Sequence, residues 1–267
     1  MLSYSASGDS AQVMLLIHGF LGDQYLWSDA APLFNKPAGS WYWKKKHQPT
    51  RFKTIVVDLP GVGESPYPKK VTDLYAISDQ LVEVLDAEGV DKAVWVGHSL
   101  GGYVTAAALR DHADRMSHAV LAYSTPLPDS PEKAASRNTN IAVIDHEGPA
   151  AFADIAAPGF FLPNDPPAIV QRYREHADRW PADTMRRTIA ALRDRDDTTE
   201  LLAAARLPIL TVQGRDDDKV PYLDADVRIG TTIVTDTGHV GVATHPHTFA
   251  GVVLGWLDDL DFAALHI

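Results

Sequence analysis

Residues 94–102 read Val94-Trp95-Val96-Gly97-His98-Ser99-Leu100-Gly101-Gly102, a G-x-S-x-G pattern between a short apolar run and a helical pattern. A serine on a sharp strand-to-helix turn has a strained backbone, which small neighbours such as Gly97 and Gly101 permit. The turn lifts the serine Oγ above the sheet, and the N-terminus of the next helix stabilises negative charge there. The stretch therefore predicts that Ser99 is a nucleophile.

Short apolar runs of the same kind recur on both sides of this stretch and predict strands that are buried on both faces. They lie at Val13–Ile17, Thr54–Asp58, Ala93–Gly97, Ala119–Tyr123 and Ile209–Gln213. Amphipathic helical patterns at Leu74–Glu88, Tyr103–Asp111 and His247–Leu257 alternate with them. This alternation predicts a parallel α/β sheet with right-handed crossovers.

One long region, Pro126–Leu207, breaks the alternation because it contains no strand signal. Helical patterns occur there around Gly148–Ala156, Pro167–Arg179, Thr184–Arg193 and Thr198–Ala205. We therefore expect a helical cap over residues 126–207, placed like a lid, between two parts of the core at residues 1–125 and 208–267.

A serine nucleophile needs a base, and the base needs a carboxylate that orients it. His239 follows a further apolar run at Thr231–Val234, whereas the rivals His245 and His247 lie at the start of a helical pattern. The acid is one of three adjacent residues, Asp216, Asp217 and Asp218, and their spacing alone does not choose between them. The order along the chain is serine, acid, histidine, with each candidate just past a predicted strand, where open α/β sheets place their sites.

An oxyanion hole requires the backbone N–H of the residue after the nucleophile and a second N–H from the turn after an early strand. Leu100 supplies the first. The second is expected from Phe20, in the turn Ile17-His18-Gly19-Phe20-Leu21-Gly22 that follows a buried strand.

Five ordered motifs together resemble the alpha/beta-hydrolase superfamily over nearly the whole chain. They are His18–Gly22, Asp58–Ser65, Gly97–Gly102, Gly214–Pro221 and Gly238-His239. The resemblance implies an eight-stranded, mostly parallel sheet flanked by helices, shortened here because only Leu2–Ser7 precedes the strand that leads into His18-Gly19. It also implies a helical cap before the strand that carries the acid, and it selects Asp217 as that acid.

Within the superfamily, the segment Glu147–Asp154 resembles small-molecule esterases, enol-lactonases and cofactor-free haloperoxidases or perhydrolases. The stretch Trp41–Lys46 departs from their pattern. It predicts a loop that aromatic side chains hold in place, with a contact surface or a substrate-entrance rim as the alternatives.

Composition excludes several classes of protein. The 267 residues carry 24 Lys and Arg against 35 Asp and Glu, a net charge of −11, which argues against a nucleic-acid or anionic-membrane partner. The absence of cysteine excludes disulfides, thiolate metal sites and a cysteine nucleophile. No apolar run is long enough to span a bilayer and no signal-peptide pattern is present, so we expect a cytoplasmic protein. Oligomeric state is not predicted.

Neither a metal nor a cofactor is expected. His18 and His98 flank the site, but no His-x-x-x-His pair exists, and we expect both to have structural roles beneath the oxyanion turn. The Gly61-x-Gly63 turn lacks the third glycine of a dinucleotide motif, and Pro66 and Pro68 follow where a helix would begin.

The predicted function is a serine hydrolase that cleaves a carboxylic ester or lactone of a small to medium, mostly apolar substrate. Ser99, His239 and Asp217 form the triad, and Phe20 and Leu100 form the oxyanion hole. Alternatives that use the same triad are a C–C bond hydrolase, a lyase or a perhydrolase, because fold does not determine function. A receptor for a small ligand on the same fold is a further alternative from another class.

Overall fold

The computed structural model describes residues 1–36, 51–220, 222–223, 227 and 229–264, with residues 261–264 described by their backbone alone. The stretch Trp41–Lys46 lies outside the described residues. Within them, seven strands form one sheet in the order β1-β3-β2-β4-β5-β6-β7. The strands are β1 (Tyr4–Ser7), β2 (Val13–Ile17), β3 (Lys53–Val57), β4 (Ala93–His98), β5 (Met116–Ala122), β6 (Ile209–Gly214) and β7 (Thr231–Thr235). The edge strand β1 pairs antiparallel with β3, and the other neighbours pair in parallel. The predicted α/β fold class is confirmed.

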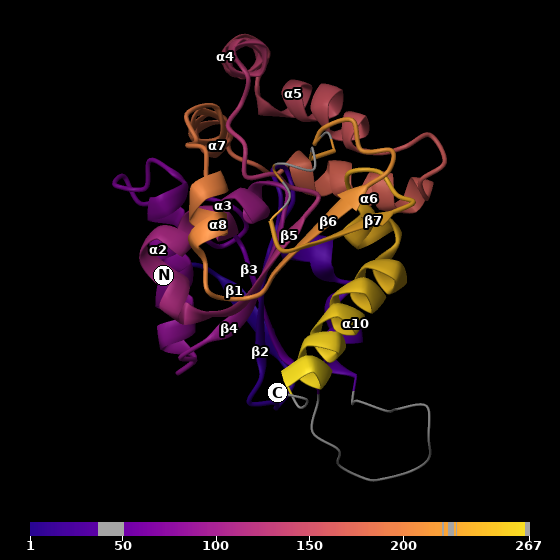
Figure 1. Cartoon of the computed structure of the whole chain (residues 1–267). Coiled ribbons are helices and arrows are strands. Elements are labelled where there is room, and N and C mark those ends of the chain that lie inside the picture. The colour runs from indigo at the N-terminus through magenta and orange to yellow at the C-terminus, as the bar shows by residue number, and fades with distance from the viewer. Residues whose placement is uncertain (37–50, 221, 224–226, 228, 265–267) are drawn as a thin grey trace.

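Helices cover both faces of the sheet (Figure 1). One face carries α2 (Leu74–Ala87), α3 (Leu100–His112) and α8 (Thr199–Ala204), and the other carries α1 (Ala31–Asn35), α9 (Gly241–Thr244) and α10 (Pro246–Ala264). Short 3-10 helices occur at Gln24–Trp27, Ala113–Arg115 and Ala157–Phe160. Because both faces are covered, the central strands are buried throughout, as the run of five buried residues in β2 shows.

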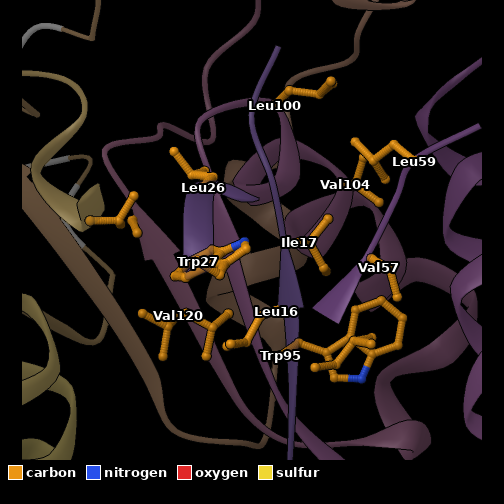
Figure 2. Packing of buried hydrophobic residues seen from close by; sticks show 14 of the residues in the cluster. Leu16, Ile17, Leu26, Trp27, Val57, Leu59, Trp95, Leu100, Val104 and Val120 are labelled. Carbon is orange, nitrogen blue, oxygen red and sulfur yellow. The ribbon is translucent and has the colours of Figure 1, made fainter. Parts of the chain in front are cut away.

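The core is built from large apolar side chains on both sides of these strands. Figure 2 shows Leu16 and Ile17 of β2 among neighbours that include Trp27 and Trp95. Both tryptophans are fully buried, and the ring of Trp27 lies 6.0 Å from that of Phe249 on α10. This packing fixes β2 and β4, and the segments that leave these two strands carry Phe20 and Ser99.

Five helices lie between β5 and β6. They are α4 (Pro131–Glu147), α5 (Pro149–Ala156), α6 (Pro167–Ala177), α7 (Ala182–Arg193) and α8. Figure 1 shows α4, α5 and α7 at the top of the view, beyond the carboxyl ends of the parallel strands. We call α4–α7 the helical insertion.

The elements that differ from the sequence-based expectation include α4, α3 and α10. The helix α4 was not predicted, because Ile144 is the one buried residue among its 17 and no apolar stripe marks it. The helix α3 begins at Leu100 rather than Tyr103, directly after the turn serine. The helix α10 extends beyond the predicted His247–Leu257 at both ends. Among the described residues, no helix is long and apolar enough to span a membrane.

Candidate active site

Ser99 lies between β4 and α3 with φ 49° and ψ −111°, a backbone conformation that is rare for a residue with a side chain. Its N–H donates to the Ala122 carbonyl of β5 at 2.9 Å. The turn brings the backbone at Gly97 into contact with the backbone at Gly101. This is possible because glycine has no Cβ, since a Cβ at Gly97 would overlap the Gly101 carbonyl. Close packing thus maintains the strained backbone of Ser99. A strained turn of this kind exposes a nucleophile.

His239 and Asp217 complete a chain of hydrogen bonds from Ser99. The Ser99 Oγ lies 3.0 Å from His239 Nε2, and His239 Nδ1 lies 2.9 Å from Asp217 Oδ2. Asp217 follows β6 and His239 follows β7, and all but a small fraction of both side chains is buried. The structure therefore brings together the three residues that the sequence placed in the triad.

The rival residues are not part of this chain of hydrogen bonds, although Asp218 lines the same cavity as Ser99 and His239. Asp218 pairs with Lys219 at 3.1 Å, and Asp216 is exposed. His245 contacts the Thr244 hydroxyl at 2.9 Å, and His247 is in the first turn of α10. Among the described residues, no hydrogen bond or ion pair joins these four side chains to Ser99 or His239.

Asp217 is held as a carboxylate. Burial raises its pKa, but the hydrogen bond and charge of His239, with the backbone N–H groups of Val220 and Lys219, outweigh burial and leave the pKa below its ordinary value. Lys219 and Val220 donate to Oδ1 at 2.8 and 3.1 Å, which leaves Oδ2 for His239. An ionised carboxylate in this place fixes the imidazole tautomer that carries its proton on Nδ1.

The turn after β2 lies against the start of α3. A Cβ at Gly101 would overlap the carbonyl oxygen of Ile17, so glycine lets the two backbones touch. Phe20 and Leu100, the two predicted oxyanion donors, are on these adjoining segments, and Leu100 is the first residue of α3. The N–H groups of the first helical turn have no partner within the helix, so they can bind a developing oxyanion.

His18 and His98 support these segments. His18 donates from Nδ1 to the Gly19 carbonyl at 2.8 Å and accepts at Nε2 from the Leu59 N–H at 2.9 Å. Burial lowers the pKa of His18, so the ring is neutral in this role. His98 donates from Nε2 to the His239 carbonyl at 2.8 Å, and burial together with the nearby His239 lowers its pKa to about 3. Both rings therefore act as neutral spacers that position the catalytic turn and the His239 loop.

Comparison with known proteins identifies the family. A family model for the alpha/beta hydrolase fold matches residues 12–148. RutD of Caulobacter sp. (strain K31), a protein assigned as a carbamate hydrolase, is 30% identical over 234 residues, which are 81% of this chain and 85% of RutD. The chain belongs to the alpha/beta hydrolase family.

Solved structures agree with this assignment and confirm the resemblance seen in the motifs. A malate-bound thermophilic esterase from Thermogutta terrifontis superposes on this alpha/beta hydrolase with a TM-score of 0.84 and 26% identity, covering 97% of this chain and 93% of the esterase. An enol-lactonase from Burkholderia xenovorans LB400 gives a TM-score of 0.82 at 19% identity, with 96% of each chain covered. At that identity the second likeness shows the shared fold.

A cavity of about 540 Å³ opens over Ser99 and His239 in this alpha/beta hydrolase. Its apolar lining comes from both the core and the helical insertion and includes Phe20, Leu127, Phe160, Leu192 and Leu223. The Phe160 ring lies 5.6 Å from the His239 ring, so the insertion reaches the triad itself. The cavity has the size and composition of a site for a small organic molecule.

The same cavity has a basic side that the sequence reasoning missed. Lys133, Arg137, Arg195 and Lys219 line it, and the first two are on the helix that was not predicted. A usable signal was the helix start Ser130-Pro131-Glu132, because serine before proline commonly begins a helix. Among the described residues, no group of three or more His, Asp or Glu side chains is arranged to hold a metal ion.

Proposed function

We propose that this alpha/beta hydrolase is a serine hydrolase that cleaves a carboxylic ester or lactone through an acyl-enzyme. The observation that carries the proposal is the hydrogen-bonded chain from Ser99 through His239 to Asp217, with distances of 3.0 and 2.9 Å, at a strained turn that faces a cavity. The largely apolar lining favours a small to medium, mostly apolar substrate.

Acylation starts with the transfer of the Ser99 proton to His239 Nε2 as Oγ attacks the substrate carbonyl. The ionised Asp217 then stabilises the imidazolium through the hydrogen bond from Nδ1. When the tetrahedral intermediate collapses, His239 returns the proton to the leaving alkoxide. In a lactone the released hydroxyl stays on the acyl chain.

Negative charge on the carbonyl oxygen is stabilised by the backbone N–H groups of Leu100 and Phe20. Each such donor lowers the barrier by about 3 kcal/mol in comparable enzymes. The α3 N-terminus adds to this effect because its partial positive charge points at the same oxygen.

Deacylation repeats these steps with water in place of the alcohol. His239 takes a proton from the water, whose oxygen attacks the acyl carbon, and the proton then passes to Ser99 Oγ as the acid leaves. Every proton transfer in this cycle uses a group of the chain, so the proposal calls for no cofactor.

The test compares hydrolysis of 4-nitrophenyl acetate and butyrate by the wild type and by Ser99→Ala. We expect turnover by the wild type and a loss of at least about 10⁴-fold in kcat for the variant. Undiminished turnover by the variant would exclude Ser99 as the nucleophile. No turnover by a folded wild type would instead favour a C–C hydrolase, a lyase, a perhydrolase or a small-ligand receptor.

Carbamate hydrolysis is a second candidate because the similarity to RutD extends over most of both chains. The same steps would then form a carbamoyl-Ser99 intermediate. Comparing kcat/KM for 4-nitrophenyl N-methylcarbamate and 4-nitrophenyl acetate separates the two. A higher kcat/KM for the carbamate would replace the ester proposal. A carbamoyl-enzyme that forms but is not hydrolysed would support the proposal of ester hydrolysis.

A further inference from the structure

The basic side of the cavity is a face of α4. Ser130, Lys133 and Arg137 line the cavity, and their spacing of i, i+3 and i+7 puts them in one row along the helix. Arg195, just after α7, and Lys219, just after the triad aspartate, line the cavity beside this row. Four cationic side chains and one acidic side chain, Asp218, therefore line the cavity, in a chain whose net charge is −11.

Nearby carboxylates neutralise these cations only in part. Asp129, whose side chain is fully buried, accepts from Arg137 at 3.0 Å and from Arg195 at 2.6 Å. One carboxylate thus serves two guanidinium groups. Lys219 has its own partner, since its ammonium lies 3.1 Å from Asp218.

Lys133 is the cation without an acidic partner. Its ammonium donates to the Lys219 carbonyl at 2.8 Å, and no carboxylate of the described residues lies within 4.0 Å of it. Burial and repulsion from Arg137 and Arg195 lower its pKa and outweigh the attraction of Asp129 and Asp217, which indicates an unfavourable site for a cation. A partly buried ammonium carries a desolvation cost that an anion in the cavity would offset.

We propose that Lys133 and Arg137 form a carboxylate-binding subsite, so that the preferred substrate is an ester or lactone that carries a second, free carboxylate. This inference rests on the proposed function of Ser99. A carboxylate suits the cluster because the cluster already holds one, Asp129, through guanidinium hydrogen bonds. The apolar lining accommodates the carbon skeleton between the reacting carbonyl and the free carboxylate.

Two pairs of esters test the proposal. The first places the charge on the acyl side, as 4-nitrophenyl hydrogen succinate against 4-nitrophenyl butyrate. The second places it on the alcohol side, as 4-acetoxybenzoate against phenyl acetate. In at least one pair we expect kcat/KM of the anionic ester to exceed that of the neutral ester by about tenfold, mainly through KM. Equal or lower values for the anionic ester in both pairs would overturn the subsite.

Variants connect the preference to Lys133. In Lys133→Met the anionic-to-neutral ratio of kcat/KM should fall about tenfold, and Lys133→Arg should retain most of it. Lys70→Met removes the same charge from an exposed turn outside the cavity and should leave the ratio unchanged. An equal fall in Lys70→Met would mean that net charge, rather than a subsite, sets the preference.

A binding measurement separates this inference from the proposed function. Calorimetric titration of the Ser99→Ala variant with succinate requires no turnover, and Lys133→Met in the same background should weaken the affinity about tenfold. Turnover of neutral esters without succinate binding or an anionic preference would contradict the subsite alone. Two results together would support the subsite and contradict the ester chemistry. They are succinate binding that depends on Lys133 in the Ser99→Ala background and an absence of esterase activity in the wild type.

Discussion

The turn between β4 and α3 and the helix α4 line the same cavity, but they are held by different interactions. All six residues of β4 and the first ten of α3 are buried, and backbone atoms touch where glycine permits. Helix α4 buries one residue, Ile144, and faces the cavity with the ends of long charged side chains. The proposed chemistry is thus located where the backbone fixes the geometry, and the proposed recognition where side chains can change without disturbing the core.

The largest effect should come from removing the charge that orients His239. We expect Asp217→Asn to lower kcat by about 10⁴-fold, because the amide favours the wrong imidazole tautomer and leaves the imidazolium unpaired. Ester hydrolysis at pH 7, with circular dichroism to verify folding, measures it.

The neighbouring Asp216 supplies a matched control. It is exposed, and Asp216→Asn makes the same chemical change one residue away, so kcat should stay within twofold of the wild type. If the two variants lost activity equally, the acid would have to be assigned elsewhere.

The second effect tests the claim that close backbone contact fixes the turn. Gly101→Ala should reduce the free energy of unfolding by about 3 kcal/mol, because the new methyl group overlaps the Ile17 carbonyl. Urea denaturation measures the change.

Gly251 in α10 is a suitable comparison because a Cβ there meets no atom within 4 Å. Gly251→Ala should increase the free energy of unfolding by up to about 1 kcal/mol, since alanine favours the helix. A gain in both variants would show that the turn between β4 and α3 tolerates a side chain at position 101 and that packing does not require glycine there.

The sequence predicted the candidate site best at positions where the backbone conformation permits few residue types. Glycine at positions 97 and 101 around Ser99 is required by the turn, so the pattern is visible in the chain itself. The ends of β6 and β7 likewise indicated Asp217 and His239 through order and position, although choosing among three adjacent aspartates required the family spacing. The sheet was predictable for the same reason, because buried parallel strands read as apolar runs.

Lys133 and Arg137 could not be predicted in this way. Charged residues on a helix usually face water, and nothing local in the sequence distinguishes a charge that faces a cavity. Their role depends on how α4 lies over the strand ends, which is a property of tertiary packing. Position-specific reasoning therefore found the residues that the structure joins by hydrogen bonds at Ser99 and missed the residues that we propose to select the substrate.

The third prediction concerns acid stability of the turn region. His98 is buried with a pKa of about 3, whereas the unfolded chain takes up the proton near the ordinary value of 6.5. Between these values the unfolded state binds more protons, so stability decreases as pH falls from about 6.5 toward 3. The contribution of His98 is about 1.4 kcal/mol per pH unit in that window.

Replacing the histidine isolates this contribution. His98→Gln keeps an amide that can donate to the His239 carbonyl and removes the titration, so its unfolding free energy should vary less between pH 6.5 and 4. The test compares the slope of the unfolding free energy against pH, so a difference in absolute stability between the variant and the wild type does not affect it. Equal slopes in the two proteins would show that other groups, among them His18, account for the acid sensitivity.

The smallest effect probes a contact between the helical insertion and the turn after β2. The Tyr173 hydroxyl on α6 donates to the Phe20 carbonyl at 2.6 Å, and both groups are buried. Tyr173→Phe leaves that carbonyl without its donor and should cost about 1–2 kcal/mol of unfolding free energy. Because Phe20 is a proposed oxyanion donor, kcat for ester hydrolysis should fall while KM changes less. Tyr75→Phe removes a hydrogen bond to Asp196 at an exposed site and should change stability by less than about 0.5 kcal/mol. If Tyr173→Phe lost stability but kept its full kcat, the helical insertion would hold the turn after β2 without affecting the oxyanion hole. The division between a rigid chemical core and an adaptable recognition layer would then be sharper than we infer.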